Sequence, residues 1–251
     1  MSGSRGADKR ESEDQAVLET LRSTYTNPLI QEAREKQDEI LLARFVGEYR
    51  RIADIGCGTG PHGSMFGPHC DLYHGFEIAP ETAAIAEARF DREGLTHAAV
   101  FVGDVGEVEL DSRLYDLCLC MYFTPGNFRD PADDLSHYTD EYLDRNPKFV
   151  TIMSRFYDAL VPGGVLLLTV YKDVPEAEGA QHDFYRNTGQ HVVTPSGTRF
   201  VATAEHFWSV RFTRDSMLSN LAGLGVEASD VIFHDLNAIA WLVEIGKPVG
   251  R

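Results

Sequence analysis

The chain carries the run Asp54-Ile55-Gly56-Cys57-Gly58-Thr59-Gly60 directly after the apolar segment Arg51-Ile52-Ala53. This placement indicates a turn that leaves a buried strand. Three glycines at alternate positions let the backbone bend sharply and let a ligand approach it closely. Pro61 suits the first position of a following helix, whose free N–H groups would point back at the turn. The sequence therefore predicts a nucleotide cradle with an acidic residue, Asp54, at its mouth.

Three further segments follow this turn in order. Residues 72–77 read as a second strand that ends in Glu77, and residues 98–105 read as a third strand that ends near Asp104. Residues 160–164 then form a Pro-Gly-Gly turn into an apolar strand at 165–170. A carboxylate can accept hydrogen bonds from two vicinal hydroxyls, which makes Glu77 a sound ribose ligand.

These four ordered matches resemble the class I S-adenosylmethionine-dependent methyltransferases, including their small-molecule members. The resemblance implies S-adenosylmethionine as cofactor and S-adenosylhomocysteine as product, with Glu77 on the ribose hydroxyls and Asp104 on the adenine amino group. It also implies an N-terminal lid over the cofactor. The expected cofactor-binding residues are Tyr25, Asp54, Gly56, Cys57, Gly58, Gly60, Glu77, Ile78, Asp104, Val105 and Met121.

Other interpretations of the same residues remain open. Gly58 to Gly63 formally fits the G-x-G-x-x-G fingerprint of nicotinamide oxidoreductases, but Gly58 lies beyond Gly56 and so out of register with the strand end. Asp54 could cap a helix, and Glu77 and Asp104 could be ordinary strand-end acids. A partner subunit that binds the cofactor without catalysis is a further alternative.

Length and composition limit the possibilities. A chain of 251 residues suits one α/β domain with appendages, and its net charge of −16 argues against a nucleic-acid substrate and an anionic membrane partner. No apolar run approaches the roughly 20 residues that span a bilayer. The N-terminus lacks an apolar signal core, so a cytoplasmic protein is expected. The four cysteines form no C-x-x-C pair, and no metal site is expected.

Strands that alternate with helices predict a mostly parallel sheet covered on both faces. The expected fold is α/β and Rossmann-like, with seven strands, one of them antiparallel, an N-terminal helical lid and a β-flap insertion. We expect a disordered tail at 1–14 and a single methyltransferase domain at 15–251. Within that domain, we expect the lid at 15–49, broken near Asn27-Pro28, and substrate-side insertions at 122–148 and 171–213.

The insertions supply the candidates for catalysis and substrate binding. Histidine titrates nearest neutrality, which makes it the usual general base. Tyr122, Phe123 and Phe128 could wall the site and favour the sulfonium through cation–π contact, or could be core residues. We therefore expect a small-molecule acceptor, cationic or amine-bearing, with nitrogen favoured over the hydroxyl oxygen of a metabolite, and leave a homodimer open. The expected catalytic residues are His182, Tyr185, Tyr122 and His206, and the expected substrate contacts are Phe123, Asn127, Phe128, Trp208 and Arg211.

Overall fold

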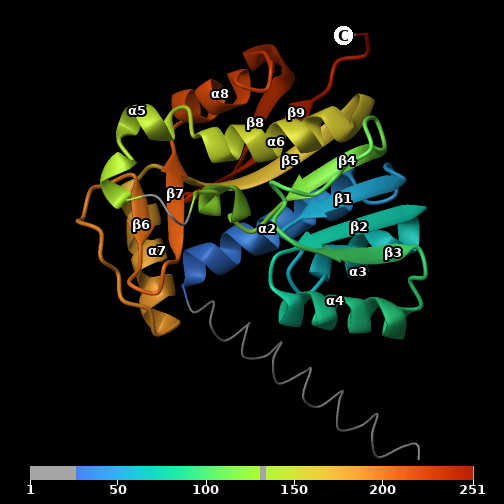
Figure 1. Cartoon of the computed structure of the whole chain (residues 1–251), viewed down its shortest axis with the longest axis horizontal. Coiled ribbons are helices and arrows are strands. Elements are labelled where there is room, and N and C mark those ends of the chain that lie inside the picture. Colours follow the sequence, from blue (N-terminus) through green and yellow to red (C-terminus); the bar gives the residue numbers. More distant parts are fainter. Residues whose placement is uncertain (1–26, 131–133, 251) are drawn as a thin grey trace, which may run out of the picture.

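A computed structural model describes residues 27–130 and 134–250. Its centre is a sheet in the order β3-β2-β1-β4-β5-β9-β8, in which β9 alone runs antiparallel to its neighbours (Figure 1). This confirms the predicted seven-stranded, mostly parallel sheet. The strands are β1 (Arg51–Ile55), β2 (Leu72–Glu77), β3 (Ala98–Val102), β4 (Tyr115–Cys120), β5 (Leu160–Lys172), β8 (Val231–Asn237) and β9 (Ala240–Gly246).

Helices cover both faces of the sheet, as expected (Figure 1). One apolar cluster joins the sheet to α2 (Pro28–Arg44), α3 (Pro61–Phe66), α4 (Pro80–Glu93) and α7 (Pro175–Asn187). The other joins it to α6 (Pro147–Ala159) and α8 (Arg214–Ala222). The central strands are buried on both faces, which explains why β4 and β5 read as continuous apolar runs. Short helical turns are α5 (Asp140–Leu143), η1 (Gly67–His69), η2 (Thr124–Asn127), η3 (Leu135–His137) and η4 (Ala228–Asp230).

Local signals set where the helices begin and end. The Asn27 side chain accepts hydrogen bonds from the N–H groups of Leu29 and Ile30, and Pro28 occupies the first turn of α2. Helix α2 therefore begins at Asn27-Pro28, where the sequence predicted a break in the helical pattern. Helix α4 ends at Gly94, whose φ of +69° is the left-handed conformation of a helix C-terminus. The expected tail and residues 15–26 of the expected lid lie outside the described residues.

The second insertion forms a hairpin and a helix. Strands β6 (Phe200–Ala202) and β7 (Trp208–Phe212) pair antiparallel, as expected for the β-flap. The last residues of β7 pair parallel with the end of β5, at Tyr171 and Lys172, beyond the point where β4 stops. Helix α7, which the sequence analysis did not specify, connects β5 to this hairpin. No helix of the described residues is long and apolar enough to cross a membrane.

Candidate functional site

The glycine loop, residues 56–60, closes the end of β1. Gly56, Gly58 and Gly60 have φ values of +69°, +57° and +76°, a conformation that side chains other than glycine adopt at a cost. The N–H groups of Gly56 and Cys57 both donate to the Phe76 carbonyl, at 2.8 and 3.1 Å, which ties the loop to the end of β2. A Cβ at Gly56 or Gly60 would collide with Thr124 or Phe90, whereas a Cβ at Gly58 would meet nothing within 4 Å. Gly58 therefore faces open space in which a ligand can approach the backbone.

Glu77 lies beside this open position. Its Oε2 accepts from the Gly58 N–H and its Oε1 from the Ala79 N–H, each at 3.0 Å. Each carboxylate oxygen has two lone pairs, so both oxygens retain the capacity to accept from a ligand. The neighbouring Ile78 is exposed. This arrangement fits an adenosyl group whose two ribose hydroxyls meet the Glu77 carboxylate.

Asp104 follows β3 at the same edge of the sheet, next to the partly buried Val105. Partial burial acts to raise the pKa of its carboxyl, but hydrogen bonds from the Gly106 N–H, at 2.7 Å, and from Lys148 Nζ, at 3.1 Å, outweigh burial and lower it. The carboxylate is therefore an ionised acceptor. An ionised carboxylate here can accept a hydrogen bond from the amino group of adenine, although Lys148 already donates to one of its oxygens.

The position of Asp54 corrects the expectation of an acid at the mouth of the cradle. Its side chain is buried beneath the loop, where Oδ2 accepts from the Tyr73 hydroxyl at 2.6 Å and lies 3.4 Å from His62 Nδ1. Burial, aided by the Asp54 charge, raises the pKa of Tyr73, so this hydroxyl keeps its proton and donates. Asp54 thus supports the loop from below.

Cys57 is buried as well, and burial raises the pKa of its thiol. A Cβ at Gly75 would lie 2.6 Å from the Cys57 sulfur, so the small side chain fits closely against β2. A protonated, enclosed thiol is a packing group and a poor nucleophile.

The turn after β4 has a strained backbone. Tyr122 and Phe123 have φ values of +51° and +68°, which are unusual for aromatic residues and are often found at functional sites. Phe123 stacks on Tyr171 with ring centroids 3.7 Å apart, and the Tyr122 hydroxyl donates to Asp38 Oδ2 at 3.0 Å. Burial, followed by the Asp38 charge, raises the pKa of Tyr122. Met121, expected at the cofactor, is buried just before this turn.

The other expected catalytic residues contact residues of the two insertions. His182 lies on α7, 3.9 Å from Glu178, and burial lowers its pKa. Tyr185 is buried on the same helix, and burial raises its pKa. His206 is exposed in the turn between β6 and β7, where its carbonyl accepts from Arg129.

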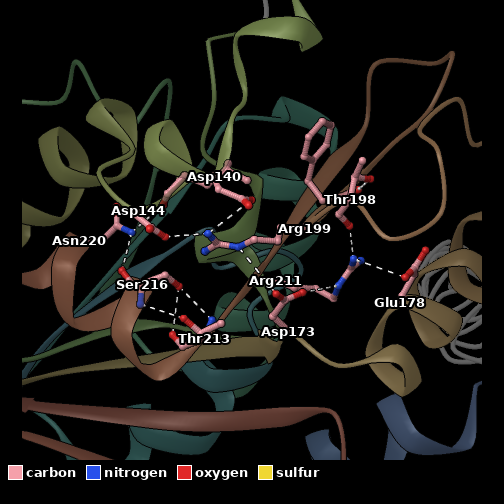
Figure 2. A network of polar contacts seen from close by, with 12 residues as sticks. Asp140, Asp144, Asp173, Glu178, Thr198, Arg199, Arg211, Thr213, Ser216 and Asn220 are labelled. Atoms are coloured by element: carbon pink, nitrogen blue, oxygen red, sulfur yellow. Dashed lines mark hydrogen bonds and ion pairs between the residues drawn. The ribbon is translucent and has the colours of Figure 1, made fainter.

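Arg211 belongs to a buried network rather than to an open binding surface. Its guanidinium donates to Asp173 at 3.3 Å, to Gln181 at 2.7 Å and to the Thr198 carbonyl. Figure 2 shows this guanidinium between Asp173, which follows β5, Glu178 on α7 and Thr198, which precedes β6. The neighbouring Arg199 contacts Asp140 and Asp144 at α5. Burial lowers the pKa of Arg211, although the charges of Asp173 and Glu178 act to raise it. The arrangement does not support Arg211 as a substrate ligand.

The aromatic substrate candidates are mostly core. Trp208 is 3% exposed and packs against Tyr138 and Phe200, and Phe128 packs near Phe149. Asn127 is exposed. Tyr25 lies outside the described residues. Within the described residues, no cluster of potential metal ligands occurs.

The sequence analysis missed three residues at the site: Gln37, Asp38 and His62. His62 is buried in the first turn of α3, directly behind the glycine loop. Gln37 is buried on the face of α2 that also buries Ala33 and Leu41. A polar residue four positions from each of two apolar ones was the signal that could have revealed Gln37.

Comparison with known proteins agrees with this geometry. Residues 52–164 match a family model described as a methyltransferase domain. Comparison with the curated proteins finds no similar sequence.

Similar solved structures include CalS10, an amino pentose methyltransferase from Micromonospora echinaspora (TM-score 0.57, 20% identity, 92% of this chain and 96% of that one). Another is the 1,6-didemethyltoxoflavin-N1-methyltransferase of Burkholderia thailandensis with S-adenosylhomocysteine bound (TM-score 0.55, 15% identity, 99% of this chain and 91% of that one). A third is DhpI in complex with SAH (TM-score 0.59, 16% identity, 96% of this chain and 95% of that one). Identities this low show the fold, and the family match covers the glycine loop, Glu77 and Asp104. Residues 52–164 therefore form a methyltransferase domain, and the fold around them is that of the class I methyltransferases, whose cofactor is S-adenosylmethionine and whose product is S-adenosylhomocysteine.

Proposed function

We propose that this methyltransferase modifies a small molecule and prefers an amine nitrogen. The observation that carries the proposal is the pairing of Tyr122 with Asp38, whose side chain is 31% exposed. Tyr122 follows the carboxyl end of β4, the edge at which open α/β sheets bind ligands. A partly exposed carboxylate at this edge can pair with a protonated amine and can accept the proton that the amine loses.

Charge and similarity support the same acceptor class. The net charge of −16 disfavours nucleic acids and favours cationic ligands. Two of the similar structures are named as an amino pentose methyltransferase and as a 1,6-didemethyltoxoflavin-N1-methyltransferase. We assign the acceptor side to the segments 122–148 and 171–213, because they begin at the carboxyl ends of β4 and β5.

In this mechanism the cofactor supplies a methyl group activated on sulfur. The glycine loop, Glu77 and Asp104 hold its adenosyl part, and the turn after β4 lies beside the acceptor. The Tyr122 hydroxyl keeps its proton and orients Asp38, and Asp38 takes the proton from the acceptor nitrogen. Alignment of acceptor and donor by such a site can contribute up to about 7–11 kcal/mol.

The test is release of S-adenosylhomocysteine with panels of amino sugars, ring nitrogens and hydroxylated aromatics. We expect turnover with an amine and a loss of kcat of about 10²–10⁴-fold in Asp38→Asn, the usual range for acid–base catalysis. Affinity for S-adenosylhomocysteine should stay within about threefold of wild type. Glu39→Gln, an exposed neighbour on α2, is the matched control.

Turnover of hydroxylated compounds alone would replace the proposal with O-methylation. Wild-type kcat in Asp38→Asn with an amine acceptor would remove Asp38 from the mechanism.

A further inference from the structure

A chain of buried polar groups runs beneath the glycine loop and connects it to α2. Its members are Gln37 on α2, Asp54 at the end of β1, His62 on α3 and Thr169 on β5, all less than 3% exposed. Buried polar groups of this kind are costly unless each is hydrogen-bonded, so their orientations are tightly specified.

The orientation of the Gln37 amide follows from its partners. Its Oε1 accepts from the Thr169 hydroxyl at 2.5 Å and from the Tyr122 N–H at 3.5 Å. Its Nε2 donates to Asp38 Oδ1 at 3.0 Å and lies 3.3 Å from His62 Nε2. Because the amide nitrogen can only donate, His62 Nε2 must accept.

The His62 tautomer follows in turn. With Nε2 as the acceptor, the ring proton is on Nδ1, which faces Asp54 Oδ2 at 3.4 Å. A second proton on Nε2 would place two donors 3.3 Å apart and would instead favour Asp38 Oδ1, now 3.9 Å away.

Two further groups approach this cluster. Tyr73 on β2 shares the Asp54 oxygen with His62, and the ring of Tyr122, in the turn after β4, lies 4.7 Å from the imidazole, centroid to centroid.

We propose that His62 is a positioning residue that couples the docking of α2 to the shape of the glycine loop and of the Tyr122 turn. Asp54 leads directly into the loop, and the Tyr122 backbone is held by Gln37. A docked α2, through the contacts of Gln37 with His62 and with the Tyr122 N–H, therefore holds both walls of the cofactor site in one arrangement. This inference rests on cofactor binding at the glycine loop and is independent of the acceptor.

Coupling of this kind is reciprocal. If docking of α2 raises affinity for S-adenosylhomocysteine by some factor, the ligand must favour docking by the same factor.

The test combines calorimetric titration of the full chain with S-adenosylhomocysteine and amide hydrogen exchange of residues 28–44. In wild type we expect the ligand to slow exchange in α2. His62→Phe and Gln37→Leu should each lose at least about tenfold in affinity and lose the slowing. Gln31→Leu, an exposed position on the same helix, should match wild type.

His62→Asn is the rescue variant, since its amide can still donate to Asp54. It should bind S-adenosylhomocysteine within about threefold of wild type.

Wild-type affinity in both His62→Phe and Gln37→Leu, or α2 exchange that the ligand leaves unchanged in wild type, would overturn the coupling alone. If His62→Phe does not melt cooperatively, Gln37→Leu decides. Failure of wild type to bind S-adenosylhomocysteine would instead defeat the cofactor site, and the coupling with it.

Discussion

Replacement of Gly58 by alanine separates fold stability from cofactor binding. At a φ of +57° alanine costs about 1–2 kcal/mol, and its Cβ would meet no protein atom within 4 Å. The melting temperature should fall by about 2–8 °C, because 1 kcal/mol corresponds to roughly 2–4 °C in a domain of this size. The methyl group occupies the space that we assign to the cofactor. Affinity for S-adenosylhomocysteine should therefore fall at least about tenfold, or ~1.4 kcal/mol.

Gly60→Ala is the matched comparison. Its φ of +76° brings similar strain, but its Cβ would also lie 2.8 Å from two ring carbons of Phe90. Overpacking adds about 1–3 kcal/mol, for a total of about 2–5 kcal/mol. The assay is thermal unfolding of both variants together with calorimetric titration. The reasoning is refuted if Gly58→Ala binds like wild type, or if it is destabilised more than Gly60→Ala.

Two further predictions concern stability. Tyr73→Phe removes the 2.6 Å donor to the buried Asp54 carboxylate and should cost about 1.5–3 kcal/mol in denaturant unfolding, and an unchanged midpoint would contradict that role. The Gly197 N–H donates to the Glu178 carboxylate at 2.9 Å and is the largest cause that lowers the pKa of Glu178 from its ordinary value of 4.5. The ionised carboxylate therefore stabilises the folded state fully above pH 4.5, and this stabilisation is lost as the pH falls through the lower pKa of the folded state. Glu178→Gln should therefore lose less stability than wild type between pH 5 and 3, and equal slopes would argue against this contribution.

Much of the fold could be predicted because its signals are local. The alternate glycines, Pro61 after Gly60, and Gly94 after α4 each fix the backbone of a few neighbouring residues, and the structure confirms the elements they delimit. The antiparallel β9 was predictable since only a short turn separates it from β8. Helix α7 was missed because its polar face and small buried residues, Ala177 and Ala180, give a weak pattern.

The site was less predictable because its side chains find partners far away in the sequence. Asp54 is buried since β2 brings Tyr73 and α3 brings His62 beneath the loop. Arg211 and Trp208 were expected to face a substrate, yet the hairpin packs both inward, and their residue types fit either location. Asp38 and Gln37 become significant only when α2 meets the turn after β4.

The most direct test of the account is calorimetric titration of the wild-type protein with S-adenosylhomocysteine, beside a nicotinamide dinucleotide. We predict saturable binding of S-adenosylhomocysteine at one site per chain and a rise in melting temperature, since a ligand at about 100 times its dissociation constant stabilises by roughly 2.7 kcal/mol. The nicotinamide dinucleotide should produce neither effect. Absence of binding by S-adenosylhomocysteine, or preference for the dinucleotide, would contradict the assignment of the glycine loop, Glu77 and Asp104 to a methyl donor.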